Sequence, residues 1–217
     1  MTVNFPSWTN KLPALVAVGA TTGLVIVVAI VWYYFSPKYT DVGYAPVQPI
    51  AFSHKLHPGL LGMDCRYCHT TVETAAHAAI PPSETCINCH GAVLPTSEAL
   101  RPLRDVHDPK NAEFGNPIPW VKVHMLPQYA YFDHSRHLSA GIGCVSCHGR
   151  VDQMEIVRQQ QPLSMSWCLE CHREPELHLR PQSELFNMEY VHDLQWAREH
   201  KQKNNINPPT HCSACHR

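Results

Sequence analysis

The chain has 217 residues with 17 basic and 18 acidic side chains, so its formal net charge is −1. Without a basic excess, the composition gives no support for nucleic acid as a partner. Ten cysteines, 16 histidines and 19 prolines stand out. This composition predicts a loop-rich fold, and the length leaves room for a membrane anchor and one further domain.

The N-terminal part predicts a single membrane anchor. Residues 1–11 form a short polar tail, and residues 12–35 carry no charge and end in four aromatic residues, Trp32 to Phe35. About 20 apolar residues span a bilayer as a helix, and aromatic residues mark its interface. A cleavable signal sequence is the alternative, but its apolar region is shorter and ends in small residues. We therefore predict an uncleaved transmembrane helix over 12–35.

The anchor is followed by a linker and then by one long domain. Residues 36–51 contain Pro37, Pro46 and Pro49 and show no helical pattern, which predicts an extended linker. The remaining residues, 52–217, form the predicted domain. Within it, 97–106 and 187–200 are the segments expected to be helical, with Pro208 and Pro209 stopping the second.

Five Cys-x-x-Cys-His motifs account for all ten cysteines. Their cysteines are Cys65 and Cys68, Cys86 and Cys89, Cys144 and Cys147, Cys168 and Cys171, and Cys212 and Cys215, followed by His69, His90, His148, His172 and His216. This is the attachment signature of c-type haem, in which two thiols bond to the porphyrin and the histidine reaches the iron. Disulfide frameworks and zinc knuckles do not require a histidine after every second cysteine. We predict five covalently bound haems, numbered 1 to 5 in chain order, with these histidines as proximal ligands.

A second motif occurs twice and indicates an internal repeat. Phe52-Ser-His54-Lys-Leu-His57 matches Phe132-Asp-His134-Ser-Arg-His137, and each copy precedes two haem motifs. We take the repeat as 52–91 and 132–172. The predicted fold is therefore mostly irregular with small helices: one transmembrane helix plus a loop-rich multihaem cytochrome c domain whose core is haem.

The histidine surplus predicts that each iron has a second protein ligand, as in an electron carrier without catalytic residues. By their equivalent positions, His54 is expected to bind haem 1 and His134 haem 3, while His57 and His137 reach a neighbouring haem. His77, eight residues after His69, is expected at haem 2.

The position that matches His77 in the second copy holds a methionine. We therefore expect Met154 at haem 4, with Met165 as the second choice, and His/Met ligation would raise its reduction potential. His124 is a candidate for a haem distant in sequence. For haem 5, the possible second ligands are His57, His124 and His137. The remaining histidines are expected on the surface or in hydrogen bonds: His107, His178, His192, His200 and His211.

Beyond the motifs, the chain resembles one family closely. Its layout is similar to class III multihaem cytochromes, and three stretches narrow the resemblance to the pentahaem cytochrome c subunit of bacterial alternative complex III. These stretches are Pro117-Ile-Pro-Trp-Val-Lys-Val-His124, Tyr131-Phe-Asp-His134 and Pro162-Leu-Ser-Met165-Ser-Trp-Cys168. The resemblance implies electron transfer within a quinol-oxidising respiratory complex. The implied partners are an iron–sulfur or molybdopterin-like subunit, integral membrane subunits, and a monohaem cytochrome c or terminal oxidase.

Three other functions were weighed against this one. A membrane-anchored quinol dehydrogenase typically has four haems and a methionine just after one motif, and no Cys-x-x-Cys-His-x-Met occurs here. Pentahaem nitrite reductase uses Cys-x-x-Cys-Lys, which is also absent from the sequence. The third alternative is the haem subunit of a periplasmic-facing quinone reductase, in which electrons flow the other way. The sequence does not distinguish it from the quinol-oxidising complex. Because c-type haem is attached outside the bacterial inner membrane, we predict a cytoplasmic N-terminus and a periplasmic haem domain.

Overall fold

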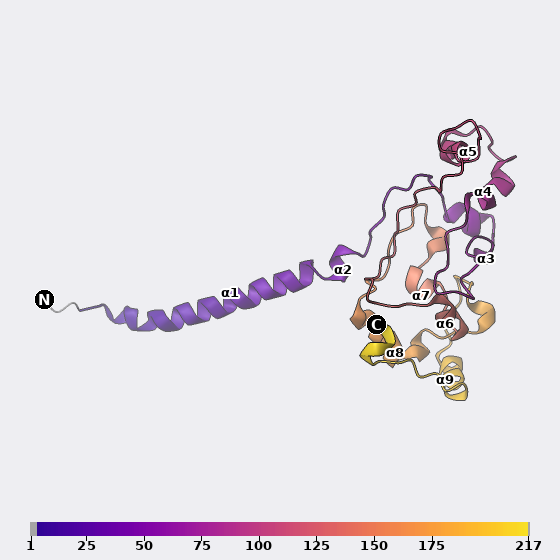
Figure 1. Cartoon of the computed structure of the whole chain (residues 1–217). Helices are drawn as coiled ribbons and strands as arrows, with labels where there is room; N and C mark the ends of the chain where they lie inside the picture. The colour runs from indigo at the N-terminus through magenta and orange to yellow at the C-terminus, as the bar shows by residue number, and fades with distance from the viewer. Residues whose placement is uncertain (1–3, 217) are drawn as a thin grey trace.

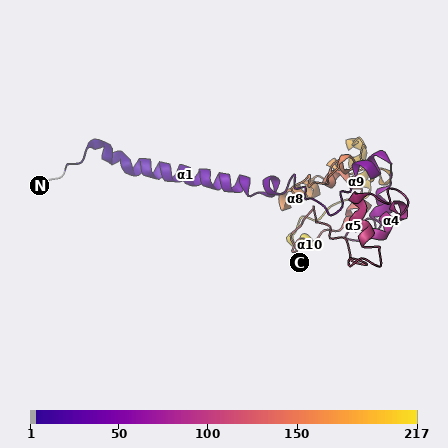
Figure 2. The ribbon, with the colours of Figure 1, turned by 90° about the horizontal axis from the view of Figure 1, so that it is seen from above.

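A long exposed helix carries the N-terminal segment away from the rest of the chain. The computed structural model describes residues 4–216. A short 3-10 turn, η1 (Ser7–Lys11), leads into α1 (Leu12–Tyr34), which buries none of its side chains (Figure 1). Seen from above, α1 again projects from the body (Figure 2). By length and composition, it is the one helix of the described residues that could cross a membrane, and its bounds agree with the predicted span.

The linker is partly helical and is fastened to the body. Ser36 precedes α2 (Pro37–Thr40), a single turn that starts with proline at its first position, where the missing N–H costs nothing. The predicted linker without helix is therefore wrong over these four residues. Beyond the turn, Gly43 donates to Gln159 O at 2.8 Å and Gln159 donates to Tyr44 O at 3.0 Å. These two backbone hydrogen bonds tie the linker after α1 to the body of the molecule.

The body is built from short helices and loops, with no β-sheet among residues 4–216. The elements after the linker are η2 (Lys55–Leu60), α3 (Cys65–Cys68), α4 (Ser83–His90), η3 (Glu98–Leu100), α5 (Arg101–Asp105), α6 (His134–Ser139), α7 (Val145–His148), η4 (Val151–Gln153), α8 (Met165–Arg173), η5 (Pro175–Leu177), η6 (Gln182–Glu184), α9 (Leu194–Lys203) and α10 (Cys212–Cys215). Two isolated antiparallel bridges join Ala130 to His216 and Ile142 to Leu179. The predicted fold class is confirmed.

Side-chain caps define where several helices begin. The side chains of Asp64, Asp133, Ser164 and Asp193 accept hydrogen bonds from backbone N–H groups in the first turns of α3, α6, α8 and α9. The predicted helix over 97–106 is present as η3 and α5. The helix predicted over 187–200 starts later because Asp193 caps it, and it ends before Asn205, which has a positive φ of 48°. That residue, rather than the prolines beyond it, ends α9.

Buried apolar side chains form only two small clusters in the described part of the chain. Val72, Leu138 and Leu185 make the first, and Ile142, Leu179 and Ala197 make the second. The accessible surface is 15289 Å², whereas a compact protein of 24.5 kDa exposes about 10,000 Å². The bare anchor and the thin core explain the excess. Side-chain packing therefore provides few of the contacts that hold the motifs in place.

We expect the second cluster to be essential for stability. Leu179 is 0% exposed and links α9 to the bridge at Ile142, so Leu179→Ala should lower the free energy of unfolding by about 2–5 kcal/mol. Leu177→Ala is the matched control, because Leu177 is 47% exposed and a surface change costs about 0.5 kcal/mol or less. Urea unfolding followed by circular dichroism measures both. Equal midpoints for the two variants would contradict the expectation.

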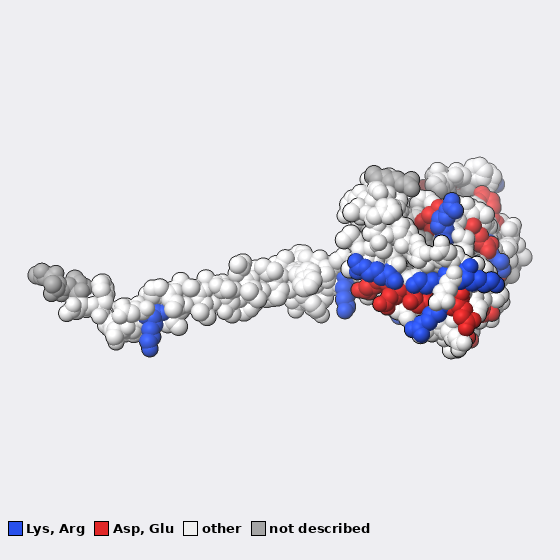
Figure 3. Space-filling view, turned by 90° about the horizontal axis from the view of Figure 1, so that it is seen from below, with Lys and Arg blue, Asp and Glu red and all other residues white. Residues whose placement is uncertain are grey.

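Charge is arranged differently on the two parts of the molecule. The shaft of α1 is uncharged, while the visible face of the body carries basic and acidic side chains intermingled (Figure 3). The ion pairs of the body include Lys201 with Glu176 at 2.6 Å and Arg150 with Asp152 at 2.7 Å. On this face no large patch of a single sign forms, in keeping with the balanced composition.

Candidate haem sites

Each Cys-x-x-Cys-His motif lies on one helical turn. In α3, α7 and α10, the backbone N–H of the histidine donates to the carbonyl of the first cysteine, at 2.9 Å in all three cases. The motifs at Cys86 and Cys168 lie within the longer helices α4 and α8. One turn brings the two thiols to the same side of the helix and places the histidine directly beyond them. All five motifs can therefore present two thiols and one imidazole to a single porphyrin.

The cysteines and their surroundings do not form another kind of site. All ten cysteines are free thiols, which excludes a disulfide framework in this structure. Among residues 4–216, no group of three or more histidine, cysteine, aspartate or glutamate side chains could hold a metal ion by itself. Zinc knuckles need such a group of four ligands. The donor set fits haem, because each motif supplies two thiols for the porphyrin and one histidine for its iron.

The ring orientation of the motif histidines also suits iron binding. The Nδ1 atom of His69 lies 2.7 Å from Ala79 O, that of His90 3.1 Å from Val93 O, and that of His172 2.7 Å from Pro209 O. Since a carbonyl only accepts, Nδ1 donates, and Nε2 keeps its lone pair for a metal. Such hydrogen bonds orient metal-binding histidines in general. His216 has the same arrangement, with Nδ1 3.1 Å from Tyr129 O.

The two Phe-x-His-x-x-His segments have almost the same geometry. Phe52 meets His54 at 4.9 Å and 88°, and Phe132 meets His134 at 4.8 Å and 88°. The phenylalanine stacks on the second histidine as well, at 4.3 Å for His57 and 4.4 Å for His137. In each copy, one phenylalanine ring therefore sets the directions of two histidines.

Three of these histidines lie opposite a motif histidine. The ring centroids are 6.2 Å apart for His57 and His90, 6.4 Å for His134 and His148, and 6.2 Å for His137 and His172. Two metal–nitrogen bonds of about 2 Å each, plus the distance from each nitrogen to its ring centre, require a separation of about 6 Å. The three distal rings also direct Nδ1 to a backbone carbonyl, of Ser53, Ala76 and Asp133 respectively. Each pair could hold one iron.

His54 lies in the corresponding place in the first copy. Its pKa is lowered to about 4, first by burial and then by the neighbouring His69 and His57. Its Nδ1 is buried without a hydrogen-bond partner. A buried, neutral imidazole beside His69 is suited to coordinate the same iron. His148 is similar: burial lowers its pKa to about 3, with further contributions from histidines that include His124, His134 and His69.

His124 lies beside His148 rather than at a remote motif. The two rings meet at 4.4 Å and 78°, which is too close for an iron between them. The Nε2 atom of His124 is buried and has no hydrogen-bond partner, and burial lowers its pKa. His124 therefore packs edge-on against the haem 3 motif, where His134 has the separation that an iron requires.

The structure differs from the sequence-based expectation at haems 2 and 4. His57, not the exposed His77, lies opposite His90, and His137 lies opposite His172. Met154 is only 5% exposed, and its carbonyl accepts from Lys55 N–H at 3.0 Å. It thus packs beside η2, at the start of the first copy. The expected pairings of His77 with haem 2 and of Met154 with haem 4 are at odds with this geometry.

The other histidines use their nitrogens within the protein. His107 Nε2 lies 3.1 Å from Ser83 Oγ, and His192 Nε2 lies 2.9 Å from Glu176 O. His200 Nδ1 accepts from Asn204 at 3.1 Å. These three placements agree with the expected hydrogen-bonded role. The Nε2 atoms of His107 and His192 therefore differ from those of the ligand candidates, because they already form hydrogen bonds within the protein.

The cysteine thiols reveal which of the first three motifs are neighbours. Burial raises the pKa of the Cys68 thiol, and the next cause is the thiol of Cys86. Burial likewise raises the pKa of Cys144 to about 11, with Cys65 as the next cause. Because charge interactions weaken with distance, motif 1 lies between motif 2 and motif 3.

The same reasoning places the last two motifs. Burial raises the pKa of the Cys147 thiol to about 12, and Cys171 is the next cause. Burial raises the pKa of Cys168, and Cys215 is the next cause. These charge interactions indicate that motif 4 neighbours motifs 3 and 5. The sequence of neighbouring motifs is then 2–1–3–4–5, which differs from their order along the chain.

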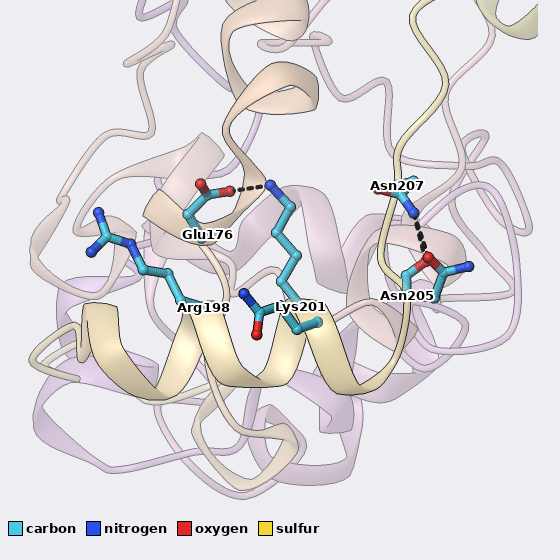
Figure 4. Close-up of a pocket in the computed structure, with 6 residues that line it drawn as sticks. Glu176, Arg198, Lys201, Asn205 and Asn207 are labelled. Atoms are coloured by element: carbon cyan, nitrogen blue, oxygen red, sulfur yellow. Dashed lines mark hydrogen bonds and ion pairs between the residues drawn. The ribbon is translucent and has the colours of Figure 1, made fainter.

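A surface pocket of about 380 Å³ lies apart from the motifs. It is lined by Glu176, Arg198, Lys201, Gln202, Asn205 and Asn207. Figure 4 shows Lys201 reaching from α9 to Glu176 across it. None of these residues belongs to a Cys-x-x-Cys-His motif or to the repeated histidine segments. The ion pair fastens α9 to η5, and we assign no role in the haem sites to this pocket.

Comparison with known proteins identifies a relative that is described as a cytochrome subunit. No family model matches the chain. The chain is 30% identical to the menaquinone reductase, multihaem cytochrome c subunit, of Nitratidesulfovibrio vulgaris, over 58% of its own length. The match covers 56% of that protein, so the chain spans about half the length of this relative. The relative's description names a multihaem cytochrome c and does not name alternative complex III.

Proposed function

We propose that this chain is an electron-transfer subunit that carries five covalent c-type haems in a quinone-linked membrane complex. A c-type haem takes up and releases one electron at its iron. The observation that carries the proposal is the set of five one-turn motifs, four of which have a histidine of the repeated segments opposite or beside their own. The relative named above, a multihaem cytochrome c subunit, supports the same reading.

The chain's residues hold each iron in a fixed environment. His54 with His69, His57 with His90, His134 with His148 and His137 with His172 provide two imidazoles each. Backbone carbonyls orient most of these rings, so little rearrangement accompanies a change of charge at the iron. Iron with both axial positions filled by protein has no room for substrate. We therefore propose a carrier rather than an enzyme that acts alone.

The order 2–1–3–4–5 makes the chain a linear relay with two ends. Each Phe-x-His-x-x-His segment contributes one histidine to each of two adjacent motifs, so it also fixes their spacing. Electrons entering at motif 2 or motif 5 would pass through the three central motifs. The two ends are the places where donor and acceptor proteins would dock.

The setting of this relay follows from the anchor. We propose that α1 spans the bacterial inner membrane once, with the N-terminus in the cytoplasm and domain 52–217 in the periplasm. The proposed partners are integral membrane subunits, an iron–sulfur or molybdopterin-like subunit and a monohaem cytochrome c. The relative is a menaquinone reductase subunit, so the direction of electron flow distinguishes two proposals: quinol oxidation in an alternative complex III, or quinone reduction.

The first test is the number of haems. The purified full chain is expected to have the mass of the polypeptide plus five haems, because all five motifs have the same one-turn geometry. Cys212→Ala/Cys215→Ala should leave four. Intact-protein mass spectrometry with haem staining measures both. A wild-type mass with fewer than five haems would reject the proposal.

A second experiment separates the two directions of electron flow. The native complex is purified by an affinity tag on this chain, and its other subunits are identified by mass spectrometry. The oxidised complex is then mixed with menaquinol or with a reduced periplasmic cytochrome, and reduction of its haems is followed by absorbance. Haem reduction by menaquinol, together with a monohaem cytochrome subunit, would support quinol oxidation. Haem reduction by the cytochrome followed by menaquinone reduction would support the function named for the relative.

A further inference from the structure

Haem 5 differs from haems 2, 3 and 4 in what lies near its histidine. His216 has Tyr129 as its ring neighbour, at 5.7 Å and 36°. Among the ring contacts of residues 4–216, no second histidine lies opposite His216. The three histidines that the sequence left open for haem 5 lie elsewhere: His57 at motif 2, His137 at motif 4 and His124 at motif 3. None of these three histidines is therefore placed opposite His216.

The segment that leads to His216 runs antiparallel to α8. Near the C-terminal end of α8, His172 Nδ1 donates to Pro209 O at 2.7 Å. One turn earlier in α8, burial raises the pKa of the Cys168 thiol, and the charge of the Cys215 thiol raises it as well. As the segment advances from 209 to 215, it therefore moves toward the N-terminus of α8. The next step brings His216 to the first turn of α8.

That first turn contains Met165. Met165 lies three residues before Cys168, so both side chains lie on the same side of α8, the side that faces Cys215. The chain leaves 67% of Met165 exposed, whereas Met154 is covered to 5%. A ligand sulfur must be reachable by the iron, and methionine is a known partner of histidine at c-type haem. Ser164 caps the helix and holds this turn in place.

We propose that Met165 is the second axial ligand of the iron bound by His216, an inference that rests on the proposed function. A thioether donates less charge to ferric iron than an imidazole and raises the reduction potential. One end of the relay is then the high-potential end. This end lies on the side of the body from which the anchor leaves (Figures 1 and 2).

The test compares the full-length holoprotein with variants of Met165. The oxidised wild type is expected to show the methionine–iron charge-transfer band, at the red edge of the spectrum, with the intensity of one haem. Met165→Ala should lose the band and turn one haem of five high-spin. Met165→His should lose the band, keep all haems low-spin and lower one midpoint potential in a potentiometric titration. Met125→Ala, at a methionine that is 54% exposed, is the matched control and should change nothing.

Removing haem 5 locates the ligand. Cys212→Ala/Cys215→Ala, with four haems by mass, should also lose the band. A band that persists in Met165→Ala overturns the proposal. So does a band that is lost in Met165→Ala but retained without haem 5, since Met165 would then serve haem 4. A wild type with five haems and no such band overturns the ligand assignment alone, whereas a wild type with fewer than five haems overturns the proposed function itself.

Discussion

Cys144→Ala/Cys147→Ala is expected to leave four haems and to stop electron transfer between the two ends of the domain. The thiols of this motif neighbour Cys65 on one side and Cys171 on the other, so motif 3 joins motifs 1 and 2 to motifs 4 and 5. Electron tunnelling slows steeply with distance. A gap in the middle should therefore lower the electron flow between the quinone pool and a soluble periplasmic protein by orders of magnitude.

The control for this prediction removes an end motif instead. Cys86→Ala/Cys89→Ala also leaves four haems, but the remaining motifs 1, 3, 4 and 5 are still neighbours. In that variant, reduction of one haem should spread through the other three at the wild-type rate, as measured by stopped-flow absorbance on proteins whose haem number has been checked by mass. In the variant without motif 3, the remaining haems should equilibrate as two separate pairs. Equal behaviour of the two variants would reject the order 2–1–3–4–5.

His137→Ala is expected to open the iron of haem 4. The ring centroid of His137 lies 6.2 Å from that of His172. His137 is half-buried, and this burial is the first cause that lowers its pKa. Its removal should turn one haem of five high-spin and let that haem bind cyanide in a stoichiometric amount. His57→Ala should do the same at haem 2. Electron paramagnetic resonance and cyanide titration of the oxidised holoprotein measure both effects.

The controls are His77 and Met154, the two residues that comparison of the repeats suggested as iron ligands. His77→Ala should leave every haem low-spin, because His77 lies on the surface and His57 occupies the place opposite His90. Met154→Ala should also keep the haems six-coordinate. Its expected effect is a loss of stability, of about 2–5 kcal/mol for a buried methionine. A high-spin haem in His77→Ala, with none in His57→Ala, would restore the pairing expected from the sequence.

The local parts of the haem sites were readable in the sequence. A Cys-x-x-Cys-His motif spans one helical turn, so its geometry depends on residues that are adjacent in the chain, and α3, α7 and α10 have the same turn. The anchor was predicted for a similar reason, since an uncharged run of sufficient length defines a helix without reference to other segments. The start of α9 was missed by several residues because the capping role of Asp193 was not recognised.

The pairing of ligands was harder to predict, because it depends on which segments meet. Comparison of the two repeats placed His77 and Met154 at equivalent positions and suggested that both bind iron. The structure instead places the two histidines of each Phe-x-His-x-x-His segment near the histidines of two different motifs. The phenylalanine contacts, at nearly equal distances in both copies, are the local signal that both histidines of a segment have a fixed direction.

By itself, the sequence determined the type and number of the Cys-x-x-Cys-His motifs, the long apolar helix near the N-terminus and the loop-rich fold class, because each depends on a short stretch of chain. Only the tertiary structure decided that His57 lies opposite His90, that His137 lies opposite His172, and that motif 1 stands between motifs 2 and 3. Segments separated by dozens of residues create these contacts, and no local pattern specifies which of them come together. With so few buried apolar side chains, hydrophobic periodicity could not supply that information either.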